Sequence, residues 1–147
     1  MKKYLIIILG LLMLVTGCLA NEDNSLVKKE LSDSVVLSYK SNKTGLDSEP
    51  YYEIYVYADK YITYGYSNLD GFAQVNLTDE QYQEIVNYIT SDKFLKLSSD
   101  ISNPNAEKEN YSQIVVYYNN YTNFTVSGNN IDNATYLGLV ELLESYK

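Results

Sequence analysis

The sequence predicts an α+β fold in which an antiparallel sheet of four to five strands carries two helices on one face, as two ββα units. Two segments of 15 residues, 53–67 and 113–127, alternate apolar and polar residues around a short turn, a pattern typical of β-hairpins. Apolar residues at helical spacing follow each hairpin. The roughly 114 residues from position 34 onwards are enough for one domain with a single core.

The first expected element is a strand at residues 34–40 (SVVLSYK), which is rich in β-branched and aromatic residues. We expect this strand to extend the sheet at an edge. A polar loop with glycine and proline breakers follows at 41–50. Two strands joined by a tight turn are then predicted at 51–58 and 60–67, and a longer loop at 68–77 leads to the first helix.

Helix start signals are clear at two places. Residues 78–81 (TDEQ) fit a capping box with acidic residues in the first turn, and Asp132 or Asn133 can cap the second helix. The apolar stripes have the spacing i, i+3, i+4, i+7. They consist of Tyr82, Ile85, Val86 and Ile89 in the first helix and of Tyr136, Leu139, Val140 and Leu143 in the second.

The two hairpins resemble each other. Segments 53–67 (EIYVYADKYITYGYS) and 113–127 (QIVVYYNNYTNFTVS) align without a gap at an offset of 60, with five of 15 positions identical. The predicted units cover about 51–92 and 111–146, and residues 100–110 are expected to link them at the surface. Either duplication or convergence on the same pattern accounts for the similarity.

Because side chains alternate along a strand, the two faces of the sheet can be assigned. The side chains expected to meet the helices are Ile54, Val56, Ile62, Tyr64, Tyr66, Ile114, Val116, Phe124 and Val126. The opposite face is expected to be open to water and to carry Tyr55, Tyr57, Tyr61, Val115, Tyr117 and Tyr121.

This tyrosine-rich side is the predicted binding site, because amphipathic rings supply contact area at low entropic cost. The candidate residues are Tyr55, Tyr57, Tyr61, Tyr117 and Tyr121. The abundance of tyrosine can also arise without any binding role. Tyrosine is a favourable residue on the exposed side of a strand, and a coding sequence rich in A and T raises the tyrosine and asparagine content of any protein.

The N-terminus has the pattern of an export signal. Lys2 and Lys3 precede an apolar stretch at 4–15, which is about 18 Å long as a helix and too short to span a hydrocarbon core of about 30 Å. The stretch ends in Val15-Thr16-Gly17-Cys18 (VTGC), which resembles the lipobox of bacterial lipoproteins.

The lipobox resemblance implies that Cys18 receives a diacylglycerol and becomes the first residue of the mature chain. The partner at this end is then the membrane, and the location is its extracytoplasmic face. We expect residues 1–17 to be removed, residues 18–33 to form a flexible tether, and residues 34–147 to form one α+β domain. Cys18 is the only cysteine, so no disulfide is available.

Composition excludes several activities. All 11 basic residues are lysine, and histidine is absent, so histidine-dependent catalysis, imidazole metal ligands and guanidinium clamps are excluded. We predict no enzyme activity, no metal and no cofactor. Without residues 1–17 the chain has nine lysines against 19 acidic residues, a formal charge of −10, which makes nucleic acid a poor partner.

The function class expected from these observations is a membrane-tethered binding module for a protein, peptide or glycan. The alternative is a self-immunity or inhibitor lipoprotein that sequesters a cationic peptide or protein through its negative charge. An enzyme using carboxylates alone, such as Glu53 on the tyrosine-rich side, is the least supported class, because no second acid is placed near Glu53 by the sequence.

Overall fold

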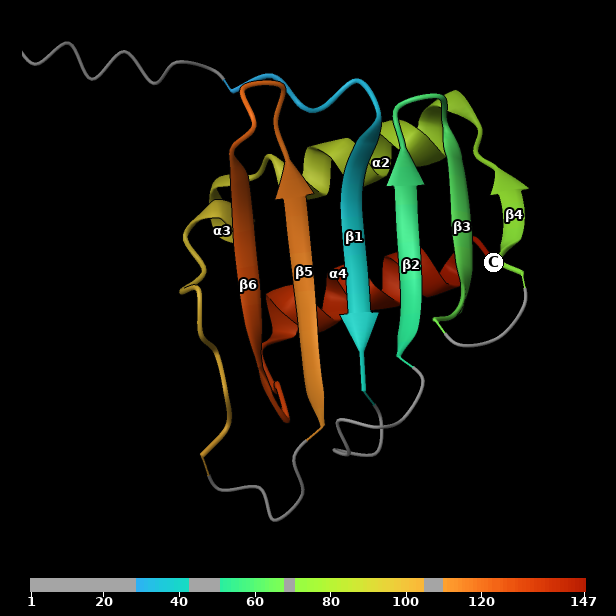
Figure 1. The fold of residues 1–147 in the computed structure, drawn as a ribbon. Coiled ribbons are helices and arrows are strands. Elements are labelled where there is room, and N and C mark those ends of the chain that lie inside the picture. Colours follow the sequence, from blue (N-terminus) through green and yellow to red (C-terminus); the bar gives the residue numbers. More distant parts are fainter. Residues whose placement is uncertain (1–28, 43–50, 68–70, 105–109) are drawn as a thin grey trace, which may run out of the picture.

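The computed structural model describes residues 29–42, 51–67, 71–104 and 110–147. In these residues six antiparallel strands form one sheet in the order β4-β3-β2-β1-β5-β6, with the helices on one side (Figure 1). The strands are β1 (Val35–Ser41), β2 (Tyr52–Tyr57), β3 (Tyr61–Tyr66), β4 (Ala73–Asn76), β5 (Tyr111–Tyr117) and β6 (Asn123–Asn129). The helices are α2 (Asp79–Ile89), the short α3 (Asp92–Leu95) and α4 (Ala134–Ser145). The predicted α+β class is confirmed, but the sheet is larger than the four to five strands expected.

Strand β1 lies in the middle of the sheet, which corrects the expectation of an edge strand. It pairs antiparallel with β2 on one side and with β5 on the other. Val36 and Leu37 are fully buried and Tyr39 is nearly so, as a central position requires. Alternation in the sequence shows which residues face the core, but it contains no information about which strands become neighbours.

Residues 68–77 were expected to be a loop, but they contain β4. This strand pairs with β3 and forms one edge of the sheet. Three of its four residues are exposed, so its sequence (AQVN) has no strong strand signal. The other edge, β6, is covered by part of the expected linker, since the backbone N–H of Ser127 donates to the carbonyl of Ser99 and the N–H of Ile101 donates to the carbonyl of Ser127.

The two hairpins meet β1 in the same register. Tyr39 pairs with Ile54 of β2 on one side and with Ile114 of β5 on the other. The offset of 60 in the sequence therefore corresponds to equivalent positions of β2 and β5 beside β1.

The two units are nevertheless arranged with opposite handedness. Strands β2 and β5 run in the same direction because both are antiparallel to β1, yet β3 lies outside β2 on one side of the sheet and β6 lies outside β5 on the other. Helices α2 and α4 cover the same face (Figure 1). No rotation can superpose such units, because turning one hairpin to the other side would move its helix to the opposite face. The topology therefore favours convergence on a pattern over duplication of a folded unit.

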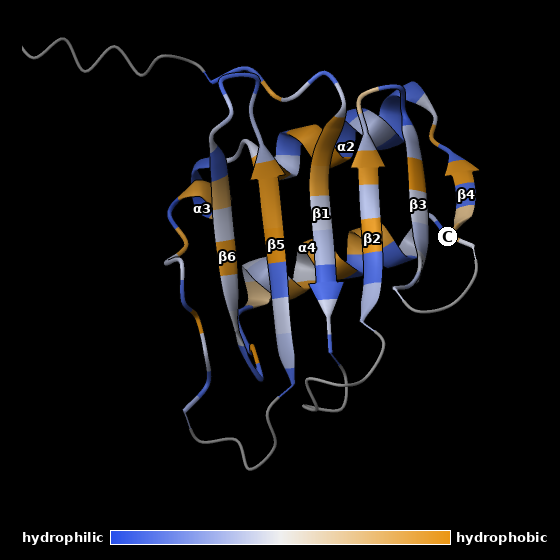
Figure 2. Cartoon of the chain, viewed as in Figure 1, coloured by the Kyte–Doolittle hydropathy of each residue, from blue (hydrophilic) through white to orange (hydrophobic). Residues whose placement is uncertain are grey.

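The core lies between the sheet and the helices, and both layers carry bands of apolar residues (Figure 2). The predicted helix stripes supply Ile85 and Ile89 from α2 and Leu139 and Leu143 from α4, all fully buried. Six of the predicted strand positions are also fully buried, namely Ile54, Val56, Ile62, Ile114, Val116 and Val126. Burying one such side chain contributes roughly 1.5–3 kcal/mol to folding.

Both helix starts are confirmed. Thr78 and Gln81 form the capping box of α2, in which each side chain accepts a hydrogen bond from the backbone N–H of the other residue. Of the two candidates for α4, Asn133 is the cap, because its side chain accepts from the N–H groups of Thr135 and Tyr136. A cap of this kind is worth about 1 kcal/mol.

Residues 30–33 pack against the β5–β6 turn, although they were expected to belong to the tether. The N–H of Ser32 donates to the carbonyl of Tyr117, and the N–H of Asn119 donates to the carbonyl of Glu30. The chain thus reaches the folded domain at one end of the sheet (Figure 1). The predicted signal peptide, Cys18 and the remainder of the tether lie outside the described residues. Among those described, no helix has the length and apolar character needed to cross a membrane.

Candidate functional site

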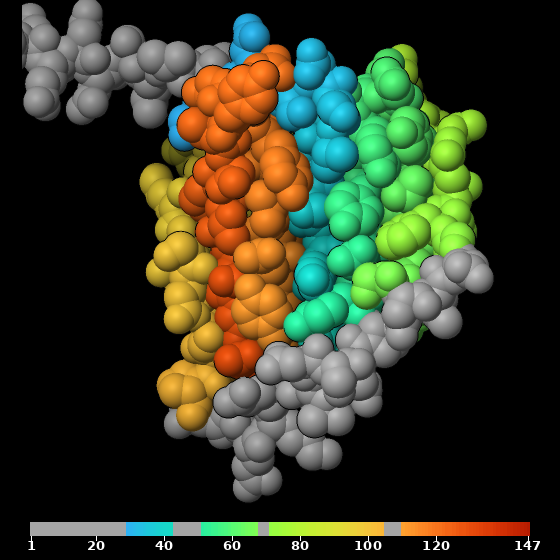
Figure 3. Space-filling view, in the orientation of Figure 1, coloured from blue at the N-terminus to red at the C-terminus, as the bar shows by residue number. Residues whose placement is uncertain are grey.

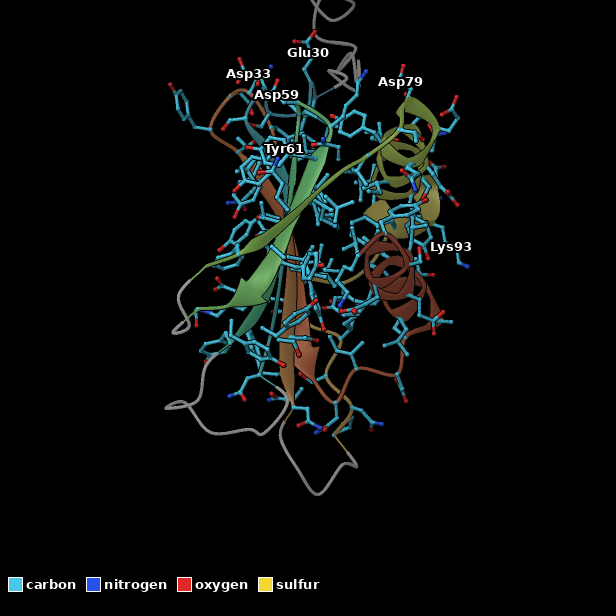
Figure 4. The ribbon with its side chains drawn as sticks, turned by 90° about the vertical axis from the view of Figure 1, so that its right-hand side faces the viewer. Glu30, Asp33, Asp59, Tyr61, Asp79 and Lys93 are labelled. Carbon is cyan, nitrogen blue, oxygen red and sulfur yellow. The ribbon has the colours of Figure 1, made fainter. Side chains whose placement is uncertain are left out.

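The candidate site is the face of the sheet that none of the described helices covers, called here the open face. It extends over the strands from β6 to β4 (Figure 3). Tyr55, Tyr57, Tyr61 and Tyr117 point to this side because they alternate with fully buried neighbours along their strands. Figure 4 shows Tyr61 on the side of the sheet away from the helices. All four rings are partly buried.

Tyr57 and Tyr61 form a stacked pair at one end of the open face. They are directly opposite each other in the β2–β3 hairpin, and their ring centroids are 4.2 Å apart with 12° between the planes. The turn that closes this hairpin places Lys60 at a φ of 61°, a left-handed conformation that ends the turn after three residues. Burial of the ring raises the pKa of Tyr61, and Tyr57 and Asp59 add to the effect.

The side chain of Tyr55 extends along β2 toward Glu53, two residues earlier in the same strand. Its hydroxyl donates a hydrogen bond of 3.2 Å to Oε2 of Glu53, and Lys40 Nζ lies 3.9 Å from Oε1 of the same carboxylate. Burial of the ring, followed by the charge and hydrogen bond of Glu53, raises the pKa of Tyr55 to about 12. Lys40 also lies over the ring of Tyr51, 3.8 Å from its centroid. Glu53 thus has a lysine and a tyrosine as partners, and among the described residues no second carboxylate forms a contact with it.

Phe72 belongs to the open face but was not predicted from the sequence. Its ring meets the edge of Tyr55 at a centroid distance of 6.0 Å. It fits there because Gly65 lies beneath it, where a Cβ would come within 3.3 Å of the ring. Phe72 is 39% exposed. A large apolar residue directly after Gly71, in a segment otherwise assigned as a loop, was the only available signal.

The side chain of Tyr117 in β5 extends over the neighbouring strand β1. Its hydroxyl is 3.0 Å from Oγ of Ser38, so the ring is held down against the sheet. Beside it, toward the end of the sheet where residues 30–33 lie, is a shallow depression of about 390 Å³. Its lining consists of Ser32, Ser34, Val35, Tyr117, Tyr118, Tyr121, Thr122 and Asn123.

Tyr121 is not on the open face with the other four residues. In the first hairpin Tyr57 pairs with Tyr61, whereas in the second Tyr117 pairs with Asn123, so the second turn is two residues longer. The ungapped alignment therefore fails beyond the turn. Tyr121 lies in the turn itself at a φ of 57°, fully exposed, and touches the site only as part of the depression beside Tyr117.

Charges are distributed unevenly between the layers. On the open face the described charged pair is Lys40 with Glu53, which neutralise each other. Exposed acids lie instead on the helical layer and at the end where residues 30–33 enter (Figure 4). These are Glu30, Asp33, Asp59, Asp79, Glu80, Glu84, Asp92 and Glu141, and Asp100 beside β6 and Asp132 just before α4 are also exposed. Among the residues that the structure describes, the open face is therefore polar and aromatic but nearly uncharged, and the exposed acids lie on other surfaces.

The described part of the chain contains no group of histidine, cysteine or carboxylate side chains arranged to hold a metal ion. No known protein family matches the chain, and no curated protein matches it significantly in sequence.

Proposed function

We propose that this protein is a lipid-anchored extracytoplasmic binding module that contacts its ligand through the open face. The observation that carries this proposal is the arrangement of Tyr55, Tyr57, Tyr61 and Tyr117 with Phe72 on a sheet surface that the described helices leave uncovered. Hydroxyl contacts hold two of these rings down against the sheet. Their positions are therefore fixed before a ligand arrives, which reduces the entropic cost of binding.

The proposed anchor is the diacylglycerol on Cys18. Residues 30–33 join the domain at one end of the strands, which supports a position of the membrane beyond that end, with neither side of the sheet covered. Residues 19–28 can span at most roughly 36 Å when fully extended. Such a tether keeps the open face accessible from the side and close to the membrane.

The ligand class that the open face fits best is an uncharged glycan of the cell envelope. Sugar rings present apolar faces that stack on aromatic rings, and the neighbouring hydroxyl and amide groups can form hydrogen bonds with them. Gln113 and Thr125 are polar members of the same surface. A strongly cationic ligand has little to pair with here, because Glu53 is already neutralised by Lys40.

Co-sedimentation of the full chain with isolated cell walls tests this proposal. The double variant Tyr57→Ala/Tyr117→Ala should bind at least about tenfold more weakly, as expected when two aromatic contacts are removed, and binding by the parent should change little with salt. Lys93→Ala on the helical layer is the matched control and should bind as the parent does. Equal binding by a folded double variant, or no binding by the parent, would refute the glycan proposal.

Sequestration of a cationic peptide is the second candidate, and one observation favours it. The outer side of α2 has a shallow hollow lined by Asp79, Glu80, Gln83, Glu84 and Asn87. Binding there would depend on charge and weaken steeply as salt is raised from about 0.05 to 0.5 M. Glu80→Gln/Glu84→Gln should then reduce the affinity for oligolysine, while Tyr57→Ala/Tyr117→Ala should not change it.

A further inference from the structure

A second aromatic site lies on the core side of the sheet and already contains an ammonium group. Lys147 follows the end of α4, and its Nζ lies 4.7 Å from the ring centroid of Tyr52 and 5.5 Å from that of Tyr64. The same ammonium donates a hydrogen bond to the Tyr52 hydroxyl and forms an ion pair with Glu144. Two rings, one hydroxyl and one carboxylate thus surround a single positive charge.

The walls of this site are held in place by further aromatic residues. Tyr52 is only 8% exposed, and its ring packs against Tyr39 at a centroid distance of 6.5 Å and against Tyr66 at 5.4 Å. The rings come from β1, β2 and β3, and the carboxylate comes from α4. Separate elements of the folded core therefore supply the walls of the site.

The contacts of Lys147 define the ligand chemistry. A positive charge within about 6 Å of a ring centroid is attracted by the negative face of the ring, and a carboxylate beside it completes the neutralisation. The bonds to Tyr52 and Glu144 require N–H donors, so a primary ammonium fits better than a quaternary one. Burial lowers the pKa of Lys147, but Glu144 and Tyr52 outweigh that effect and raise it overall, so the group is charged at neutral pH.

We propose that the tyrosine cage, formed by Tyr52, Tyr64 and Glu144, is a binding site for the side chain of a lysine in a peptide ligand. Lys147 is then an internal occupant that such a lysine displaces. Lys147 lies beyond the C-cap residue of α4 and its side chain is 22% exposed, so its departure does not require the helix to unfold. Displacement exchanges one ammonium for another of the same kind. The intramolecular lysine competes at an effective concentration in the millimolar range, so it sets a threshold that an incoming peptide must exceed.

Calorimetric titration of the full chain in detergent micelles with Nα-acetyl-lysine amide tests the proposal. Lys147→Met keeps the apolar stem and removes the charge, so this variant should bind the probe at least about tenfold more tightly than the parent. Adding Tyr64→Leu should abolish the gain, and tetramethylammonium, which lacks N–H groups, should bind Lys147→Met more weakly than the lysine probe. Lys93→Met, an exposed lysine on α3, should behave as the parent does.

Two outcomes would overturn the proposal. One is that folded Lys147→Met binds the probe no better than the parent. The other is that Tyr64→Leu leaves the improved binding unchanged. A measurement on the parent protein alone needs no variant. A large excess of probe should raise the rate at which acetic anhydride acetylates Lys147 relative to Lys93. An unchanged ratio of the two rates would show that Lys147 is a fixed structural contact.

Discussion

Tyr136 and Tyr55 represent two kinds of tyrosine environment in this protein, the core and the open face. Tyr136 is 1% exposed in the core, where its hydroxyl lies 3.1 Å from Oγ of Ser112. Tyr55 is on the open face, with its ring partly covered and its hydroxyl bonded to Glu53. In both places the neutral phenol is favoured over the phenolate, because a charged oxygen would be desolvated or would face a carboxylate.

Stability should therefore fall at alkaline pH. Burial is the main cause that raises the pKa of Tyr55 and of Tyr146 to about 12, and it raises that of Tyr136 still further. In the unfolded chain these groups ionise near pH 10, so the unfolded state releases protons first as pH rises. The free energy of unfolding should be greatest below about pH 10 and decrease through pH 12. Denaturant titrations at several pH values, followed by tyrosine absorbance, measure this decrease, and constant stability from pH 9 to 12 would contradict it.

Substitution by alanine should affect stability differently at Gly128 and at Gly138. A Cβ on Gly128 would lie 2.7 Å from the backbone nitrogen of Ser102, in the segment that covers β6, and backbone cannot move aside easily. Gly128→Ala should cost about 1–3 kcal/mol. A Cβ on Gly138 would meet only the hydroxyl end of Tyr88, and alanine gains about 1 kcal/mol of helix propensity, so Gly138→Ala should change stability by less than about 1 kcal/mol. Urea unfolding of both variants compares them, and equal losses would contradict the assigned contacts.

At the scale of elements, β1 holds the two hairpins together. It supplies the pairing partner of both β2 and β5, so the six-stranded sheet depends on residues that precede either hairpin in the chain. The edge strand β4 contributes less, since three of its four residues are exposed.

Truncation of side chains in these two strands should show that difference. Leu37→Ala in β1 removes a fully buried side chain and should cost about 2–5 kcal/mol. Val75→Ala in β4 removes a half-buried one and should cost less than about 1.5 kcal/mol. Thermal unfolding of the two variants tests the order, and a larger loss for Val75→Ala would contradict the central position of β1.

The elements that could be predicted from the sequence are those whose signals are local. The capping box at Thr78 and the spacing of Ile85 and Ile89 are signals contained within one helix, and both predictions were correct. The position of β1 depends on pairing between distant segments, which a periodic pattern does not contain. Tyr121 was misplaced because two extra turn residues preserve the alternation of the strand while shifting the alignment.

Of the five tyrosines predicted to form the binding site, all but Tyr121 lie on the open face. Alternation assigns the faces of a strand reliably when one face is buried. The contacts that organise the open face could not be predicted in the same way. Phe72 reaches Tyr55 from beyond the β3 strand, and Ser38 and Lys40 reach the site only because β1 is central.

The proposed function requires attachment of the protein to the membrane. Cys18→Ser removes the thiol that would carry the diacylglycerol, and with it the two acyl chains that would make a stable anchor. The variant should therefore leave the membrane fraction. Cell fractionation with and without detergent measures this, and a variant that stays in the membrane fraction would contradict the lipoprotein assignment.

If a ligand of the cell envelope covers the open face, it should protect the tyrosines there from chemical modification. The rate of tyrosine modification would be measured by mass spectrometry for the full chain with and without isolated cell walls. We expect Tyr55, Tyr57, Tyr61 and Tyr117 to be protected by the walls, while Tyr88 and Tyr146 on the helical layer keep their rates. Protection confined to the helical layer, or no protection at all, would contradict binding of such a ligand to the open face.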